Sequence, residues 1–164
     1  MPLPFVLPEN CKIFSCYPRV TTGATIYPWA AQYVSLKLAE MVWILCNIQQ
    51  ATAATLALTI EQATNVAGGG SKVITKNIPI WRNLDTLVND TFVRDTDAVG
   101  YTTDAGIKNK AVLFQLDPGI LDSANGFYAV VLKSGAGAAT TYLSVEFIIL
   151  PHHRSANPPS VMVD

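Results

Sequence analysis

The sequence of 164 residues has little charge of either sign. Only 14% of its residues are charged, and 11 Lys and Arg against 12 Asp and Glu leave a formal net charge of -1. Ordinary soluble domains carry roughly 25% charged residues. A near-neutral chain lacks the basic surface of a nucleic-acid-binding protein, so nucleic acid is excluded as a partner. Because 50% of the residues are hydrophobic, disorder is excluded too, and we expect much of the uncharged surface to meet protein.

The residue types that bind metals or act as nucleophiles are also scarce. The three cysteines, Cys11, Cys16 and Cys46, match no zinc or redox spacing, so we expect reduced thiols, with Cys46 buried in an apolar run. The only histidines, His152 and His153, are neighbours that point to opposite sides of an extended chain. No nucleophile motif is present. The sequence therefore predicts no metal site, no cofactor and no catalytic residues.

Targeting and membrane-spanning segments are not indicated. The N-terminus has prolines at positions 2, 4 and 8 and no basic residue before Lys12, which is unlike a signal peptide and predicts synthesis in a cytoplasm. The stretch between Glu40 and Glu61 is uncharged, but polar residues interrupt it and its second half alternates with a period of two. We expect two strands joined by a turn at Gln49–Thr52, and no contact with a membrane.

Segments rich in β-branched and aromatic residues, bounded by turn residues, recur along the chain and predict strands. They are Tyr33–Lys37, Met41–Ile48, Thr55–Gln62, Lys72–Trp81, Ala111–Asp117, Phe127–Ser134 and Thr141–Leu150, with weaker ones at Thr91–Thr96 and Val99–Thr102. Only Leu84–Asn89 and Pro118–Ala124 have a helical pattern. Many short strands with one apolar face need a second sheet to cover them. The expected fold is all-β, a single-domain antiparallel β-sandwich or jelly-roll-like structure.

Two loops and the last strand give more detailed predictions about the fold. The Gly-rich segment Ala67–Ser71 and the segment Ser134–Ala138 are predicted to close hairpins. In the last strand, the apolar residues at 143, 145, 147 and 149 alternate with mixed residues, so that face is expected to pack on the core. Gly68–Lys72 lacks the spacing of a phosphate-binding loop.

Proline-rich ends flank the predicted sandwich. Residues 1–28 are expected to form an extended N-terminal arm, residues 29–150 the β-sandwich domain, and residues 151–164 an extended C-terminal tail. Such ends can clasp a neighbouring subunit. The candidate partner contacts are the apolar residues and one proline near the two termini: Pro4, Phe5, Val6, Leu7, Val161, Met162 and Val163.

Two further groups of residues leave alternatives open. Asp90, Asp95, Asp97 and Asp104 could bind calcium or belong to a solvated loop, and they lack the remaining ligands of an EF-hand loop. The aromatic residues, among them Trp29, Trp43 and Trp81, could stack on sugars or lie in the core and at subunit interfaces.

Four segments carry a resemblance to a known group of proteins: Thr55–Lys72, Ile80–Trp81, Arg94–Asp97 and Lys110–Asp117. Together they resemble the small β-rich virion proteins that tailed bacteriophages encode beside the major capsid protein. The resemblance covers roughly Tyr33 to Leu150 and includes the phrase Glu-Gln-Ala-Thr followed by Gly-Ser-Lys. It implies a capsid decoration or cement protein on the capsid surface of the virion.

The resemblance also implies the partners. They are the major capsid protein and copies of the chain itself, for which a homotrimer is one expected assembly because capsids offer three-fold positions. The alternatives are a tail or head-completion protein, or a receptor-binding or adhesion module whose aromatic residues contact a glycan. The Pro-rich ends match nothing in that group, and no residue role follows from the resemblance.

Overall fold

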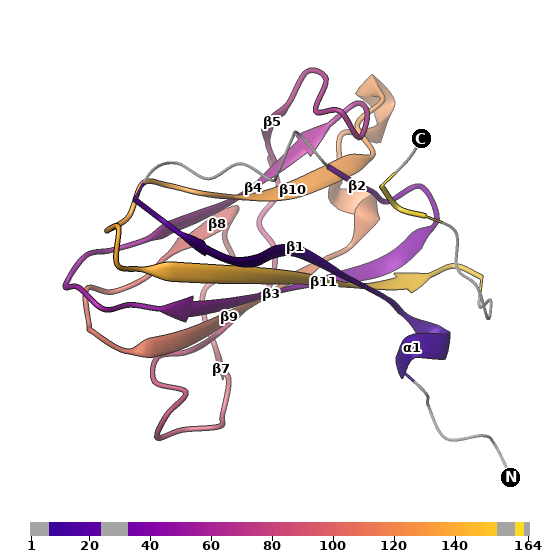
Figure 1. The fold of residues 1–164 in the computed structure, drawn as a ribbon. Helices are drawn as coiled ribbons and strands as arrows, with labels where there is room; N and C mark the ends of the chain where they lie inside the picture. The colour runs from indigo at the N-terminus through magenta and orange to yellow at the C-terminus, as the bar shows by residue number, and fades with distance from the viewer. Residues whose placement is uncertain (1–6, 24–32, 154–159, 163–164) are drawn as a thin grey trace, which may run out of the picture.

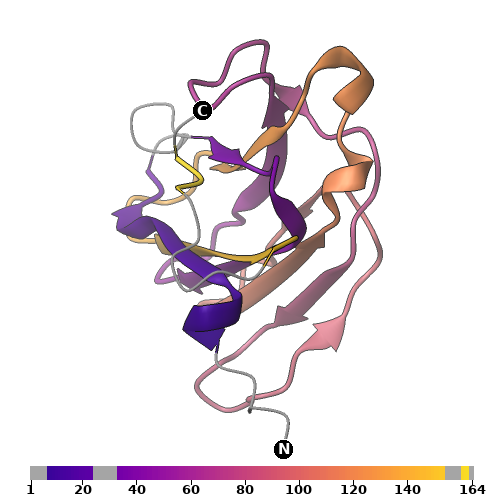
Figure 2. The ribbon, with the colours of Figure 1, turned by 90° about the vertical axis from the view of Figure 1, so that its right-hand side faces the viewer.

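The computed structural model describes residues 7–23, 33–153 and 160–162. These residues form two antiparallel β-sheets that face each other as two layers (Figures 1 and 2). The predicted all-β sandwich is therefore confirmed. No helix in these ranges is long and apolar enough to span a membrane.

The larger sheet has six strands in the order β1-β11-β3-β9-β6-β7. Their bounds are β1 Lys12–Thr21, β3 Ala39–Gln49, β6 Ile80–Asn83, β7 Val93–Arg94, β9 Asn109–Leu116 and β11 Tyr142–Pro151. The smaller sheet has the order β2-β10-β4-β5, and β8 also pairs with β4. Its strands are β2 Val34–Ser35, β4 Ala57–Ala63, β5 Lys72–Val73, β8 Gly100–Thr102 and β10 Ala129–Ser134.

The core lies between the sheets and consists of the alternate residues that face inward. Leu143, Val145, Phe147 and Ile149 of β11 are all buried, which confirms the face predicted for this strand. They meet buried side chains from both sheets, among them those of Ile44, Ile60, Phe114 and Leu132. The alternation follows from the two-residue period of a strand, which sends successive side chains to opposite faces.

The prediction of an N-terminal arm over residues 1–28 is wrong for part of its length. Lys12–Thr21 is a ten-residue strand, β1, at the edge of the larger sheet, and it pairs antiparallel with β11 (Figure 1). The helical turn α1, Leu7–Asn10, precedes it. The pairing register shifts twice, once around Pro18, which has no backbone N–H to donate. The sequence of this strand contains proline and lacks regular alternation, so it does not have the usual strand pattern. Both features are tolerated at a sheet edge.

The two hairpin predictions have different outcomes. The Gly-rich loop does join an antiparallel pair, β4 and β5. Gly68 there has a φ of 83°, and a Cβ on it would lie 2.7 Å from the ring of Tyr33, so glycine is required. The loop Ser134–Ala138 closes no hairpin, because β10 belongs to the smaller sheet and β11 to the larger. The turn at Gln49–Thr52 likewise connects strands of different sheets, β3 and β4.

Two further predicted elements are replaced by shorter ones. Lys72–Trp81 is not one strand, since β5 ends at Val73 and β6 begins at Ile80 in the other sheet. Leu84–Asn89 forms turns, and Pro118–Ala124 contains the 3-10 helix η2, Pro118–Ile120, with a second one, η3, at Ser123–Asn125. Lys72–Trp81 and Pro118–Ala124 mark places where the chain passes from one sheet to the other, which local propensity does not register.

All three cysteines are free and buried, as predicted for Cys46. Burial raises the pKa of the Cys16 thiol to about 11 and raises that of Cys46 further. Because the thiolate is the reactive form, we expect no reaction of the native protein with a thiol reagent such as DTNB within minutes. Unfolding in guanidinium should release all three thiols. Fast labelling of any one of them before unfolding would contradict this expectation.

Candidate interaction surface

The connection between β6 and β7 is the most exposed apolar segment among the described residues. We call residues 84–93 the apolar loop; it projects from the lower end of the sandwich in Figure 1. Its side chains include Leu87, which is 75% exposed, and Val88, which is 81% exposed. Leu84, Phe92 and Val93 are exposed as well. Several large apolar side chains gathered on one segment make it a candidate interaction surface, whereas single exposed ones do not.

Asparagine and aspartate side chains shape the apolar loop. Asn83 Oδ1 accepts from the N–H of Asp85 at 2.9 Å, and Asp85 Oδ1 accepts from the N–H of Leu87 at 3.3 Å. Asn89 repeats the arrangement with the N–H of Thr91 at 2.9 Å. These bonds to the backbone two residues ahead are Asx turns. They explain why the segment forms turns in place of the predicted helix.

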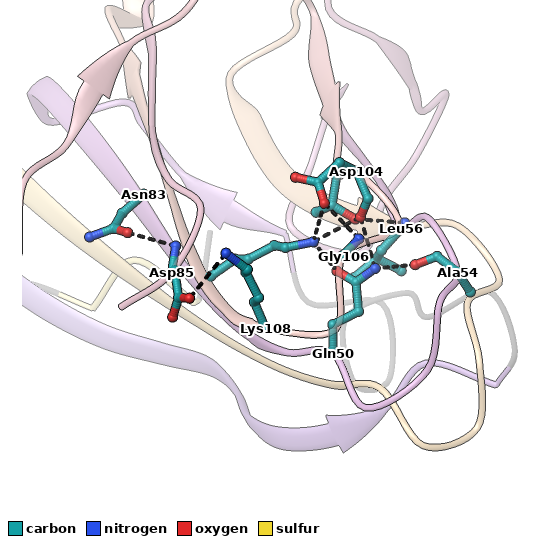
Figure 3. A network of polar contacts seen from close by, with 10 residues as sticks. Gln50, Ala54, Leu56, Asn83, Asp85, Asp104, Gly106 and Lys108 are labelled. Atoms are coloured by element: carbon teal, nitrogen blue, oxygen red, sulfur yellow. Dashed lines mark hydrogen bonds and ion pairs between the residues drawn. The ribbon is translucent and has the colours of Figure 1, made fainter. Parts of the chain in front are cut away.

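The apolar loop is also tied to the start of β9. The N–H of Thr86 donates to the carbonyl of Asn109 at 2.8 Å, and Lys108 Nζ lies 3.2 Å from a carboxylate oxygen of Asp85 (Figure 3). At the end of β6, Asn83 Nδ2 donates to the carbonyl of Asn89 in the loop at 2.6 Å. Backbone and side-chain bonds therefore hold the loop in one conformation while its apolar side chains stay exposed.

A buried lysine lies next to these anchors on β9. The side chain of Lys110 is 1% exposed, and its Nζ donates to Gln50 Oε1 at 2.9 Å, to the carbonyl of Asp104 at 2.8 Å and to Asp104 Oδ1 at 3.0 Å. An ammonium group has three donors, so it is fully satisfied. Gln50 Nε2 in turn donates to the carbonyls of Ala54 and Asp104. This network joins β9 to two loops at the same end of the sandwich, as Figure 3 shows around Gln50, Asp104 and Gly106.

The electrostatics of the network favour the charged pair. Partial burial raises the pKa of the Asp104 carboxyl, but hydrogen bonds from Lys110 and from the N–H of Gly106 lower it by more. Its pKa therefore lies below the ordinary value for aspartate, and the carboxylate is ionised at neutral pH.

A shallow hollow adjoins the apolar loop on the outer face of the larger sheet. Its volume is about 320 Å³. It is lined mostly by neutral polar residues, among them Asn47, Gln49, Thr86, Asn109, Tyr142 and Ser144. Its lining holds no carboxylate or histidine. The hollow thus offers hydrogen bonds to a docked surface beside the apolar side chains of the loop.

The structure describes three of the predicted terminal contact residues. Leu7 begins α1 and is exposed, whereas Pro4, Phe5, Val6 and Val163 lie outside the described residues.

Val161 and Met162, at the other end of the chain, are half-buried. Val161 packs against the chain's own core, and its carbonyl accepts from the N–H of Ser35 at 2.8 Å. These contacts lie within the chain, and the contact of Val161 with a neighbouring subunit stays a prediction.

The other candidate chemistries find no common site. His152 and His153 are exposed, and among the described residues no group of three or more His, Cys, Asp or Glu is placed to hold a metal ion. Three of the four aspartates considered for calcium pair with basic side chains: Asp95 with Arg82, Asp97 with Arg94, and Asp104 with Lys110. Trp29 lies outside the described residues, and Trp43 and Trp81 are half-buried on the larger sheet.

Comparison with known proteins gives remote structural similarities. No family model and no curated protein matches the chain. Among solved structures it is similar to the SPBc2 prophage-derived protein YomS, with a TM-score of 0.48 and 7% identity over 85% of this chain and 92% of that one. A structure of infectious bursal disease virus Gx strain gives a TM-score of 0.26 and 11% identity, over 87% of this chain and 41% of that one. At these scores the function has to be inferred from the chain's own residues.

The apolar loop was missed by sequence reasoning, although a signal for it is present. Asn83, Asp85 and Asn89 are residues that favour Asx turns over helix, and apolar residues stand between and after them. A helical pattern of Leu84, Leu87 and Val88 competes with that signal. Only the contacts of the loop with β9 decide between the two.

Proposed function

We propose that the chain is a non-enzymatic structural protein of a phage virion. In this proposal it binds the major capsid protein, decorates the head lattice and stabilises it by bridging neighbouring capsid subunits. The observation that carries the proposal is the apolar loop, in which Leu87 and Val88 are almost fully exposed on a braced backbone. A loop already held in one conformation loses little entropy when it docks.

The low charge of the chain supports the same function. Only 14% of the residues are charged, and charged groups are costly to remove from water when a surface is buried. A protein that covers a lattice buries much of its surface, so neutral polar side chains such as those around the hollow suit it. The resemblance of Thr55–Lys72 and the other segments to phage virion proteins points the same way.

The absence of catalysis is part of the proposal. The described cysteines are buried with raised pKa values, which disfavours nucleophilic thiolates. The carboxylates of Asp95, Asp97 and Asp104 are engaged in ion pairs. A docking role needs none of these groups to react.

Charge placed on the apolar loop should weaken capsid binding. Leu87→Asp combined with Val88→Asp is expected to weaken binding to empty shells at least tenfold. Each aliphatic side chain is worth about 1.5–3 kcal/mol when buried, and 1.4 kcal/mol is a factor of ten. The measurement is co-sedimentation of the purified protein with empty capsid shells, scored as copies per shell. Both residues are exposed, so the fold should be unaffected.

A matched control is Leu38→Asp. Leu38 is 54% exposed and lies just before the start of β3, at the opposite end of the larger sheet from the apolar loop. This variant should bind shells as the wild type does. Equal binding by the loop variant would remove the loop from the proposal.

The same experiment separates the alternative roles. Wild-type protein that joins shells at only a few copies per particle would support a tail or head-completion role. Protein that ignores shells but binds a glycan panel, with loss of binding in Trp81→Ala, would support an adhesion role.

A further inference from the structure

A row of five side chains crosses the outer face of the larger sheet. The strand pairing places Glu146 of β11 beside Leu45 of β3, and Leu45 beside Leu113 of β9. It then places Leu113 beside Trp81 of β6, and Trp81 beside Arg94 of β7. We call these five residues the cross-strand row. Side chains paired in this way share one face of a sheet.

The cross-strand row points away from the core. Next to the row members on β11, β3, β9 and β6, the strands carry residues that are buried in the core: Val145, Phe147, Ile44, Val112, Phe114 and Ile80. Arg94 on β7 joins the same face because it stacks on the ring of Trp81. None of the five row residues is itself buried. The row therefore lies on the surface, over five neighbouring strands of the sheet.

The charges of the row are arranged symmetrically about β9. Glu146 lies two strands from β9 on one side, and Arg94 lies two strands from it on the other. Between them are three apolar side chains. Arg94 stacks over the ring of Trp81, 4.5 Å from its centroid, and also pairs with Asp97. Glu146 accepts a hydrogen bond from Asn47 Nδ2 at 3.4 Å.

We propose that two copies of the chain pair through this face, related by a two-fold axis that runs along β9. Rotation about that axis brings Glu146 of each copy opposite Arg94 of the other. It also brings Leu45 opposite Trp81 and sets Leu113 against its own counterpart. Paired strands are about 4.8 Å apart, so both charges lie about 10 Å from the axis. A contact of this kind is closed and self-complementary.

The charges select this axis over the other in-plane one. An axis across the strands would place Glu146 against Glu146 and Arg94 against Arg94, and like charges buried face to face are unfavourable. The next row, Asn47, Ala111 and Asn83, adds no charge to this face, and Ala111 and Asn83 are themselves buried. The apolar loop contributes no residue to the row, so the pairing does not depend on capsid binding.

Charge reversal tests the pairing in the full-length protein. Sedimentation equilibrium should give the wild type a mass that rises to two chains with concentration. Glu146→Arg should weaken this association at least about tenfold, because it places an arginine opposite Arg94 of the other copy. Arg94→Glu should weaken it equally, because it places a glutamate opposite Glu146 of the other copy. The double variant should recover most of the affinity. Recovery distinguishes a contact between copies from damage to the fold, which a second reversal would not repair.

Lys76→Glu is the control for charge reversal. It reverses an exposed charge away from the row and should pair as the wild type does.

Cross-linking provides a second test. Leu113→Cys adds a thiol on the axis to a chain whose own thiols are buried, so a short bismaleimide should link it into a covalent dimer. Ile107→Cys, exposed but away from the row, should not be linked.

Several results would overturn the proposed pairing. They are a wild type that stays monomeric at all concentrations, a double variant as weak as either single variant, and an unlinked Leu113→Cys protein. A mass of three chains would favour the homotrimer expected from the sequence and would likewise reject the two-fold pair.

Discussion

Replacing Lys110 by Met is expected to lower the free energy of unfolding by about 3 kcal/mol. Methionine keeps much of the length and apolar stem of lysine but removes its charge and three donors. Gln50 Oε1 and the carbonyl of Asp104 would each lose a donor. Gln50 is buried, and an unpaired buried polar group costs about 1–3 kcal/mol.

The measurement is the free energy of unfolding from urea denaturation, compared between variants whose unfolding free energy has the same dependence on urea concentration. Lys108→Met is the matched control, because Lys108 is two residues away on the same segment but half-exposed, and its pair with Asp85 is a surface pair. Such pairs contribute about 0–1 kcal/mol. If Lys110→Met unfolded within about 1 kcal/mol of the control, the network would not stabilise this end of the sandwich.

Replacing Phe147 by Ala is expected to cost about 3–5 kcal/mol, a large part of the roughly 5–15 kcal/mol that stabilises a domain. Phe147 is fully buried in β11 between β1 and β3. Its ring lies 6.3 Å from that of Phe14 in β1. The substitution leaves a cavity between the sheets and removes the contact that anchors the edge strand.

Ile13→Ala provides the control for this cavity. Ile13 lies on the same edge strand, next to Phe14, but it is 48% exposed and its side chain points to the opposite face of the sheet. Its truncation should cost less than about 1 kcal/mol. Thermal unfolding of the two variants at equal concentration measures the difference. Similar losses would mean that β1 is not anchored through Phe147.

Sequence patterns located most of the long strands correctly. Met41–Ile48 falls within β3, and the alternation after Thr141 identifies both β11 and its buried face. Both follow from the two-residue period of a strand, which any single segment displays on its own. The burial of Cys46 is a consequence of the same alternation.

Pairing between strands was not predictable in the same way. Ser134–Ala138 has the composition of a hairpin loop but carries the chain from one sheet to the other. A turn that keeps the chain in one sheet and a loop that crosses the core use the same residues. The edge strand β1 was assigned to an arm for a related reason, since an edge position tolerates proline and lacks strict alternation.

The sequence by itself determined that this protein is a β-sandwich of low charge, because composition and period are properties of each segment. Only the tertiary structure decided where its candidate surfaces lie. The apolar loop depends on bonds from Asp85 and Thr86 to residues more than twenty positions later. The cross-strand row joins Leu45 to Glu146 across a hundred residues. Such neighbours are set by strand order and register, which arise when the sheets pack and which no local pattern encodes.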